Sequence, residues 1–304
     1  MTDFALSSYL AAERESVEPA LEDVVSRLES DLPPDVGAAI RHGVMGGGKR
    51  LRPILCATAY RACSKEDPVP LNGAVYALAA ALELIHCYSL MHDDLPCMDD
   101  AELRRGQATT HVAHGEAATA RAGAALIPAA ALQALAAAGE LGCGSGVAVE
   151  VARELMQAAG AGGMVGGQWL DLEGEGQELG GEQLDDLYGA KTGALLTASL
   201  VVGAKAAGAG GPVVEAMRRY GRAIGLAFQI TDDILDATQS AETLGKEPSD
   251  AVLAKSTYVA LYGLEKARER ARAQVADAVR ALDSENVDSL PLRALASYIV
   301  EREA

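Results

Sequence analysis

Apolar residues recur every three or four positions along most of the chain, which is the spacing of one face of an α-helix. This pattern predicts an amphipathic helix over residues 4–30 and a more apolar one over 71–92. The second helix is expected to stop near Pro96, because proline removes a helical hydrogen bond and clashes with the preceding turn. Further helices are predicted at 116–138, 146–159, 182–205, 212–238, 250–282 and 288–303.

Short glycine-rich breaks separate these segments, and none is long enough to be an interdomain linker. They lie at 43–48, 139–146, 160–167, 174–181 and 208–211. No segment shows the sustained two-residue alternation of a β-strand. The chain is rich in alanine, with two Phe and one Trp, whereas a β-sandwich or barrel favours β-branched and aromatic residues. We therefore expect an all-α protein with one domain over residues 1–304.

The charge balance narrows the choice of partners. Lys and Arg total 26 against 43 Asp and Glu, a net charge of −17, which disfavours binding to nucleic acid and to anionic membrane surfaces. The uncharged run over 122–139 consists mostly of Ala and Gly, so we expect a packed helix and no membrane span. No secretory signal is visible at the N-terminus, and the five cysteines form no C-x-x-C pair. A reducing, cytoplasmic location is expected.

Two clusters of aspartates stand out against apolar helical segments. The first, H-D-D-L-P-C-M-D-D, covers residues 92–100, and the second, Q-I-T-D-D-I-L-D, covers 229–236. Asp232 and Asp236 are four residues apart and project from one helix face. Like charges crowded among apolar side chains raise each other's pKa unless a cation neutralises them. Oxygen ligands with no set of His or Cys ligands nearby favour magnesium, which is commonly bound by a few carboxylates together with substrate phosphates.

Basic residues lie near both clusters. The segment G-G-G-K-R-L-R-P at 46–53 combines a flexible backbone with three cations in four residues. It matches part of a phosphate-loop pattern, but Arg50 stands where that loop needs Ser or Thr and no strand precedes it. An anion clamp remains, in which Arg52 can grip phosphate oxygens with two hydrogen bonds. Arg104 and Arg105 follow the first cluster, and His86 lies two helical turns before Asp93 on the same face.

Taken in order, these motifs resemble those of the trans-polyprenyl diphosphate synthases, above all the bacterial short-chain members that make farnesyl diphosphate. The resemblance rests on G-G-K-R-L-R-P at 47–53, D-D-x-x-x-x-D at 93–99 with R-R-G after it, G-G-Q-x-x-D at 166–171, K-T-G at 191–193, F-Q-x-x-D-D-I-L-D at 228–236, then L-G-K and K-S-T-Y at 255–258. It implies an isoprenoid-synthase fold with helices around a central catalytic cavity, and a homodimer. The segment 244–258 is one residue shorter than is usual in the family, which leaves the register of Asp250 and Lys255 open.

The activity implied by the resemblance is a magnesium-dependent head-to-tail condensation of isopentenyl diphosphate with dimethylallyl or geranyl diphosphate, giving (2E,6E)-farnesyl diphosphate. By the family pattern, about three magnesium ions are bound, with Asp93 and Asp99 holding two of them and Asp232 helping to hold a third. Three further aspartates would support the ions through water or through hydrogen bonds to their ligands: Asp94, Asp233 and Asp236.

The resemblance also divides the basic residues between two diphosphates. Those expected at the allylic diphosphate are Arg104, Lys191 and Lys246, with Lys255 nearby. Those expected at isopentenyl diphosphate, which carries no magnesium, are Lys49, Arg52, His86 and Arg105. Thr192 and Gln229 would lie beside the carbocation and turn oxygen dipoles toward it. Lys191, Thr192, Gln229, Asp93 and Asp232 are therefore the expected catalytic set.

Product length in such an enzyme depends on where a bulky side chain blocks the growing tail. Tyr88 lies five residues before Asp93, about 7.5 Å along the helix, a plausible floor for a fifteen-carbon product. Ser89 beside it is small, and residues 96–107 also resemble geranylgeranyl diphosphate synthases, so a twenty-carbon product stays open.

The motifs disfavour two other classes of protein. A class I terpene cyclase shares the fold but needs neither a second aspartate cluster nor a separate clamp for a metal-free diphosphate. A non-catalytic helical subunit would be expected to lack some of the acidic or basic motifs, and none of them is missing from this sequence.

Overall fold

The chain is almost entirely helical in a computed structural model, which describes residues 4–65, 71–174, 176–238 and 256–301. Within those residues the strands β1 (Leu103–Arg104) and β2 (Gln107–Ala108) form one antiparallel pair. The all-α prediction is confirmed. The chain forms two compact units. We call residues 7–57 with 66–153 the amino-terminal unit, and residues 1–6, 58–65 and 154–304 the carboxy-terminal unit. The expectation of one domain over 1–304 stays a prediction.

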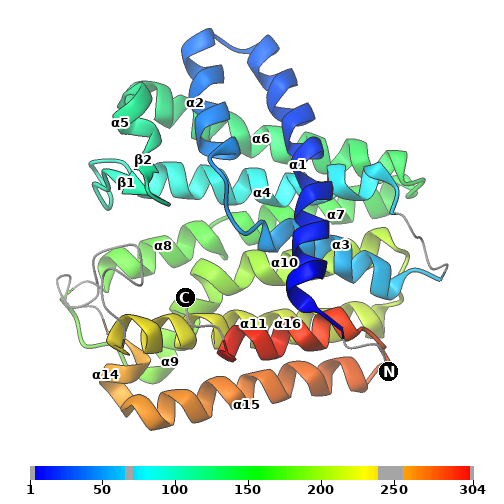
Figure 1. Ribbon diagram of the computed structural model, residues 1–304, viewed down its shortest axis with the longest axis vertical. Coiled ribbons are helices and arrows are strands. Elements are labelled where there is room, and N and C mark those ends of the chain that lie inside the picture. Colours follow the sequence, from blue (N-terminus) through cyan, green and yellow to red (C-terminus); the bar gives the residue numbers. More distant parts are fainter. Residues whose placement is uncertain (1–3, 66–70, 175, 239–255, 302–304) are drawn as a thin grey trace. The chain divides into compact units, whose positions relative to one another are not determined.

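The amino-terminal unit is built around α4, which packs along α6 (Figure 1). Its elements are α1 (Leu6–Asp31), α2 (Pro34–Met45), the first part of α3 (Leu51–Cys63), α4 (Gly73–Asp93), β1, β2, α5 (Thr110–His114), α6 (Glu116–Glu140) and most of α7 (Ser145–Ala159). The side chain of Asn72 caps α4 by accepting a hydrogen bond from the Ala74 amide at 2.9 Å. Because α4 is apolar nearly all round, it is buried on most sides and fixes the direction of the first aspartate cluster at its end.

The helices α1 and α2 form a hairpin at residues 32–33 (Figure 1). One arginine of α2 joins them, because Arg41 lies 2.8 Å from Glu22 and 2.6 Å from Glu29 of α1. All three side chains are partly exposed, so water weakens these ion pairs. They join α2, which leads into the glycine-rich segment at 46–48, to α1.

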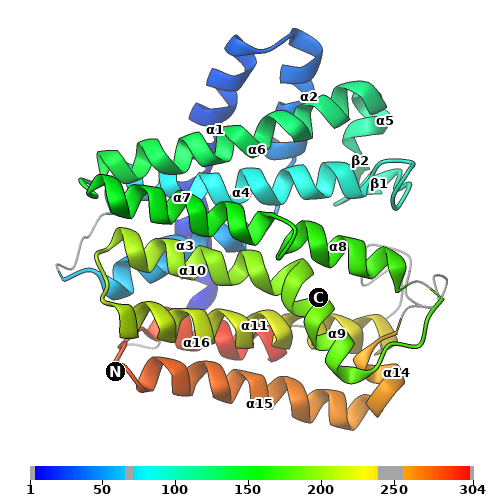
Figure 2. The same cartoon turned by 180° about the vertical axis from the view of Figure 1, so that it is seen from behind.

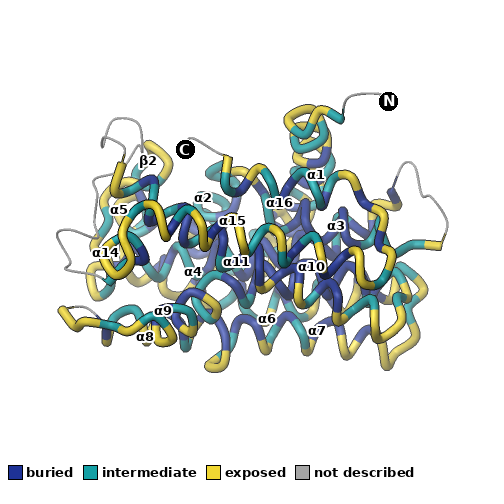
Figure 3. Tube along the Cα trace, turned by 90° about the horizontal axis from the view of Figure 1, so that it is seen from below, coloured by how far each residue is buried: buried dark blue, intermediate teal, exposed yellow. Residues whose placement is uncertain are grey.

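The carboxy-terminal unit contains the second aspartate cluster on α11. Its elements are the last part of α3, the end of α7, α8 (Met164–Glu173), α9 (Gly181–Tyr188), the π-helix η1 (Gly189–Gly193), α10 (Ala194–Ala206), α11 (Gly211–Thr238), α14 (Tyr258–Tyr262), α15 (Leu264–Asp283) and α16 (Leu290–Glu301). In Figure 2, α10 and α11 run side by side, with α15 along α11. Buried positions follow both α10 and α11 in Figure 3.

Glycines let α11 approach the preceding helices closely. A Cβ atom on Gly225 would lie 2.7 Å from the Cα of Gly193, and one on Gly221 would lie 2.6 Å from the Cα of Thr197. Real Cβ atoms do not come that near to another backbone, so neither position accepts a side chain without a shift. The contacts of α11 with η1 and with α10 therefore depend on these small residues.

Several boundaries differ from the sequence-based expectation. The helix expected over 250–282 is broken at Gly263, whose φ of 81° separates α14 from α15, and residues 250–255 lie outside the described part. The break expected over 160–167 holds the start of α8. Helices α2, α3, α5 and α8 were not predicted, because such short segments show little periodicity.

Three helices of the described part have the length and hydropathy of a membrane span, namely Gly73–Asp93, Glu116–Glu140 and the combined segment Gly181–Ala206. In the first and last of these, 72% and 78% of the most apolar window is covered inside the protein, against 39% for α6. The expectation of no membrane span stays a prediction.

Candidate active site

The first aspartate cluster folds back on the end of α4. The amide of Asp99 donates to the Asp93 carbonyl at 2.8 Å, and the amide of Ala101 donates to the Asp94 carbonyl at 3.2 Å. The first of these bonds brings Asp99 next to Asp93, although the two residues are six positions apart in the sequence. Asp93 is half-buried and Asp99 is exposed, so solvent reaches both residues.

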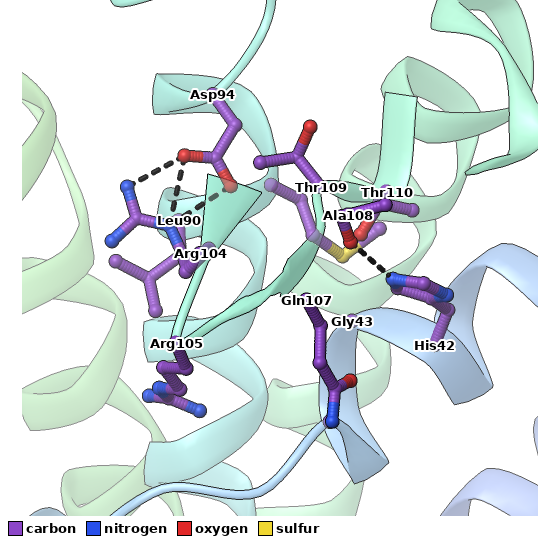
Figure 4. Close-up of a pocket in the computed structure, with 12 residues that line it drawn as sticks. His42, Gly43, Leu90, Asp94, Arg104, Arg105, Gln107, Ala108, Thr109 and Thr110 are labelled. Atoms are coloured by element: carbon purple, nitrogen blue, oxygen red, sulfur yellow. Dashed lines mark hydrogen bonds and ion pairs between the residues drawn. The ribbon is translucent and has the colours of Figure 1, made fainter. Parts of the chain in front are cut away.

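Asp94 differs from its neighbours because its carboxylate is buried against an arginine. The Arg104 guanidinium donates to Asp94 at 2.8, 2.9 and 2.6 Å, and the Asp94 residue is 3% exposed (Figure 4). Burial alone would lower the pKa of Arg104, but the hydrogen bonds to Asp94 and the charges of Asp93 and Asp99 raise it. Asp94 therefore acts by holding Arg104 beside the two accessible aspartates.

The hairpin of β1 and β2 sends two consecutive arginines in different directions. Arg105 and Gly106 form its two-residue turn, with φ of 54° and 76°, as the right-handed twist of paired strands requires. Figure 4 shows Arg104 directed at Asp94 and Arg105 directed away from it. Arg105 donates instead to the carbonyl of Gly47 in the glycine-rich segment. The two arginines of the R-R-G motif therefore bind different partners: Arg104 binds Asp94, and Arg105 binds the Gly47 carbonyl.

A cluster of basic side chains surrounds His86 on α4. Burial lowers the pKa of His86 well below its ordinary value, and the charges of Arg52 and Arg105 lower it further, followed by those of Arg104 and Arg50. Burial also lowers the pKa of Arg52, whose Nε is enclosed and has no hydrogen-bond partner among the residues that the structure describes. A neutral imidazole among arginines, together with this Nε–H donor of Arg52, is suited to bind an anion that carries no metal. Lys49 is exposed at the start of this segment.

Arg50, between the two predicted basic ligands of this segment, is a structural residue. Its backbone is left-handed, with φ of 50°, and its side chain is fully enclosed. The guanidinium lies 2.9 Å from Glu18 of α1 and 3.0 Å from Glu83 of α4. It fixes the turn that leads into α3, where Arg52 lies.

The second aspartate cluster lies near the end of α11. Asp232 and Asp236 are half-buried and one helical turn apart, whereas Asp233 is 6% exposed. The Tyr188 hydroxyl donates to both Asp233 oxygens at 2.8 Å, and the Tyr258 amide donates at 2.7 Å. The spacing D-D-x-x-D therefore places two aspartates where solvent reaches them and one where protein donors enclose it.

Lys191 lies in the π-helix and is held by an aspartate of α8. Its Nζ lies 2.6 Å from Oδ2 of Asp171, the last residue of the G-G-Q-x-x-D motif. The approach depends on Gly167, since a Cβ there would lie 2.1 Å from the Lys191 backbone nitrogen. In the next residue, the Thr192 hydroxyl donates to Oε1 of Gln229 on α11. The predicted catalytic residues Lys191, Thr192 and Gln229 thus form one connected group.

The sequence interpretation gave no role to several residues that the structure brings to these sites. Asp171 and Gln168 belong to a quoted motif, and neither amide atom of the buried Gln168 is hydrogen-bonded within the described residues. Tyr188 lies three residues before K-T-G and carried no separate signal. Lys246 and Lys255 lie outside the described residues.

The residues that could bind magnesium offer carboxylate oxygens that are open to solvent. Among the described residues, no three acidic, His or Cys side chains gather closely enough to hold an ion unaided. This donor set fits magnesium, which keeps several waters and is usually held by one or two carboxylates plus phosphate oxygens. Asp93 and Asp99 would supply protein ligands in one unit, and Asp232 and Asp236 in the other.

Tyr88 and Ser89 lie about one turn before the end of α4. The Tyr88 residue is 5% exposed, and its ring meets that of His92 edge to face, with centroids 5.7 Å apart. Burial, together with the charge of Asp93, raises the pKa of Tyr88 to about 12. Ser89 is four residues before Asp93 and lies on its face of the helix, where its hydroxyl donates to the His86 carbonyl.

A model of the polyprenyl synthetase family matches residues 33–295. The chain is 40% identical to "Geranylgeranyl pyrophosphate synthase 7, chloroplastic" of Arabidopsis thaliana, over 99% of this chain and 85% of that protein. It is also 40% identical to a dimethylallyltranstransferase of Fischerella ambigua, over 98% of this chain and 84% of the other.

Solved structures agree with these relatives. An FPP/GFPP synthase from Zymomonas mobilis has a TM-score of 0.77 and 34% identity, covering 96% of this chain and 99% of that one. A geranyltransferase from Helicobacter pylori, complexed with magnesium and isoprenyl diphosphate, has a TM-score of 0.78 and 30% identity, covering 96% of each chain.

Proposed function

The chain belongs to the polyprenyl synthetase family and is a prenyltransferase, and on that premise we propose that it condenses isopentenyl diphosphate head to tail with dimethylallyl and geranyl diphosphate. The proposed product is (2E,6E)-farnesyl diphosphate. The family membership rests on the match to residues 33–295, and the substrates and product are the further step.

One observation carries this proposal: the amino-terminal unit has two different places for an anion. One presents Asp93 and Asp99 to solvent with Arg104 beside them, which suits a diphosphate complexed with magnesium. The other gathers Arg52 and Arg105 around a neutral His86, which suits a diphosphate without metal. A condensation of two diphosphates, only one of which leaves, needs both kinds of site.

The chemistry assigns a task to each group of residues. Departure of the allylic diphosphate leaves a carbocation, to which the double bond of isopentenyl diphosphate adds. The adduct then loses a proton to the released diphosphate, which forms the new double bond. Magnesium, when bound, supplies positive charge for the departing diphosphate. Lys191 and Arg104 would donate hydrogen bonds to that diphosphate, whereas Thr192 and Gln229 would direct oxygen dipoles at the carbocation. The proposed number of magnesium ions is about three, in keeping with the aspartates of both clusters.

A direct assay tests the proposal. Purified protein is incubated with magnesium, radiolabelled isopentenyl diphosphate and each of the five-, ten- and fifteen-carbon allylic diphosphates, and the products are separated by length. We expect elongation of the first two and little of the third. No incorporation of label with any of the three substrates would contradict the proposed reaction.

The metal-free anion site has its own test. Calorimetry with inorganic diphosphate in the presence of a chelator should detect binding that is lost in Arg52→Gln or Arg105→Gln. Glu173→Gln, an exposed change on α8, is the control. Equal binding by all four proteins would contradict the assignment of these arginines.

Tyr88 is proposed as the residue that limits the product to fifteen carbons. Its enclosed ring and its position five residues before Asp93 support this role. Tyr88→Ala should lengthen the product, whereas Tyr88→Phe, which keeps the ring, should not. An unchanged fifteen-carbon product from Tyr88→Ala would overturn the assignment.

Geranylgeranyl diphosphate is the second candidate product. It is favoured by the small Ser89 one turn before Asp93, and by the name of the Arabidopsis relative. The same assay separates the two candidates, because a geranylgeranyl diphosphate synthase extends the fifteen-carbon substrate. In that case Ser89→Phe should shorten the product.

We also propose that the protein is a cytoplasmic homodimer. The helix α6 leaves apolar side chains uncovered, with Leu132 66% and Leu135 37% exposed, and less of its apolar stretch is covered than in α4. A second copy packed on this helix would bury them. Light scattering on the purified protein should give twice the mass of one chain, and Leu132→Glu should reduce it to a single chain.

A further inference from the structure

Asp233 has used its whole carboxylate on protein donors. Both oxygens accept from the Tyr188 hydroxyl at 2.8 Å, and Oδ2 also accepts from the Tyr258 amide at 2.7 Å. The residue is 6% exposed, so a magnesium ion could reach it only by displacing these donors. Asp232 and Asp236 on the same helix remain half-buried and reachable.

The surroundings of this carboxylate are apolar, which makes its three hydrogen bonds necessary. The buried residues packed together here are Leu184, Leu187, Tyr188, Ile230, Tyr258, Ala267 and Ala271. An ionised carboxylate in such a place is costly unless each oxygen is hydrogen-bonded. The donors therefore indicate that an acidic side chain is needed at this position, because a leucine could not accept hydrogen bonds from the Tyr188 hydroxyl and the Tyr258 amide.

Tyr188 connects the two parts of the carboxy-terminal unit that hold predicted catalytic residues. It is the last residue of α9 and directly precedes η1, where Lys191 and Thr192 lie. Its hydroxyl reaches α11 one residue beyond Asp232. One helical turn earlier on α11, Gln229 accepts from Thr192. Two side-chain bonds thus fix η1 against the acidic segment of α11.

The segment K-S-T-Y continues this connection. The Ser256 hydroxyl accepts from the Leu179 amide at 2.9 Å and donates to the Gln177 carbonyl at 3.0 Å. Thr257 caps α14, and the amide of Tyr258 completes the bonds to Asp233. Three consecutive residues therefore tie the chain to the loop before α9, to the start of α14 and to α11.

We propose that Tyr188 is a positioning residue for the magnesium-binding aspartates: its hydroxyl, with the Tyr258 amide, holds Asp233 so that Asp232 and Asp236 present their carboxylates to a magnesium–diphosphate complex. Asp233 acts through these bonds and does not touch the ion. The inference rests on the proposed function, because it takes Asp232 and Asp236 as magnesium ligands.

The test compares Tyr188→Phe, Asp233→Asn and the double variant with the unaltered protein. Calorimetry measures the magnesium-dependent binding of inorganic diphosphate, and the assay measures kcat and the KM of both substrates. In each variant we expect half-saturation to need about tenfold more magnesium, the size typical when a residue that orients a metal ligand is changed. The KM of isopentenyl diphosphate should not move, since its proposed residues lie in the amino-terminal unit.

Two comparisons separate positioning from other roles. If Tyr188 acts through Asp233, the double variant should be no worse than either single variant, because residues that work through one bond are not additive. Tyr262→Phe removes a hydroxyl from the neighbouring exposed tyrosine and is the control. Thermal melting shows whether each variant is folded.

The outcomes are distinct. Unaltered magnesium dependence in Tyr188→Phe overturns the proposal, as does full additivity in the double variant. A loss of thermal stability with unaltered magnesium dependence assigns Tyr188 a structural role alone. If the unaltered protein binds magnesium and diphosphate but transfers no prenyl group, the proposed function fails while the binding data still decide the positioning role.

Discussion

The guanidinium of Arg50 and the carboxylate of Glu83 lie 3.0 Å apart in the interior of the amino-terminal unit, with side-chain exposures of 0% and 2%. Removing one charge of such a pair leaves the other buried without compensation, which costs about 3–5 kcal/mol. Glu83→Gln should therefore lower the free energy of unfolding by about that amount in urea titrations. The control is Glu18→Gln, which alters the more exposed partner of Arg50 and should cost much less. Equal losses in both variants would contradict the burial argument.

Asp99 and Asp100 are adjacent, and we expect only Asp99 to contribute to catalysis. Asp99→Asn removes an expected magnesium ligand and should reduce kcat by about a hundredfold, as the loss of one group that stabilises transition-state charge does. Asp100→Asn should be nearly silent, because Asn tolerates the φ of 48° found there. The measurement is steady-state kinetics at saturating magnesium. Similar losses in both variants would speak against the assignment.

The ion pair between Asp171 and Lys191 predicts a substrate-specific defect. Asp171→Asn removes the charge that holds Lys191 Nζ, now 2.6 Å away, so the lysine loses its fixed direction. We expect kcat/KM for the allylic substrate to fall about tenfold, with the KM of isopentenyl diphosphate unchanged. Glu173→Gln, two residues further on the same helix, serves as the matched control. A defect confined to isopentenyl diphosphate would refute the role given to Lys191.

His86 should make the protein less stable in mild acid. Its pKa in the folded state is well below the ordinary 6.5, because of burial and the facing charges of Arg52, Arg105, Arg104 and Arg50. Below pH 6.5 the unfolded chain takes up a proton that the folded protein does not, so stability falls as the pH drops.

The contribution of this one group is at most about 1.4 kcal/mol per pH unit. His86→Gln should flatten the decline in the free energy of unfolding between about pH 7 and pH 5. His111→Gln, on α5, tests whether the loss of any histidine does the same. Parallel curves for His86→Gln and the unaltered protein would show that His86 plays no part.

The glycine contact beneath Lys191 gives a further prediction. Gly167→Ala would place a Cβ 2.1 Å from the backbone nitrogen of Lys191, so α8 and η1 must move apart. The free energy of unfolding should fall by several kcal/mol, because the added Cβ overpacks a contact between two backbones. We expect kcat to fall as well. Gly189→Ala, in the π-helix itself, meets no atom within 4 Å and should be tolerated. Thermal melting and the prenyl-transfer assay measure both effects.

The long helices could be predicted from the sequence because each has a strong apolar period. The expected helix over 71–92 is α4, and the one over 212–238 is α11 within one residue. The break at Gly263 was missed, because a single glycine in a periodic segment does not reveal a positive φ. Short helices such as α8, whose first turn holds two glycines, show too little periodicity to be recognised.

The spacing of the aspartates in the sequence is enough to locate the acidic motifs. It is not enough to assign a role to each aspartate. The sequence shows that Asp232 and Asp236 share a face, since that follows from helical geometry alone. It does not show that Asp94 meets Arg104 or that Asp233 meets Tyr188, because those partners come from other elements. The opposite directions of Arg104 and Arg105 likewise depend on a turn whose two residues both have positive φ.

The π-helix at Gly189–Gly193 shifts the phase of the segment that runs from Gly181 to Ala206. Thr192 meets Gln229, and the very next residue, Gly193, meets Gly225, a full turn away along α11. A π-helical turn holds more residues than an α-helical turn, so neighbouring side chains point less far apart than the roughly 100° of an α-helix. Within this wider turn, Thr192 makes a polar contact with α11 and Gly193 allows the two backbones to pack closely. Deleting one residue from this turn would restore the α-helical phase and turn Thr192 away from Gln229 or Gly193 away from Gly225, so either the polar contact or the close packing would be lost.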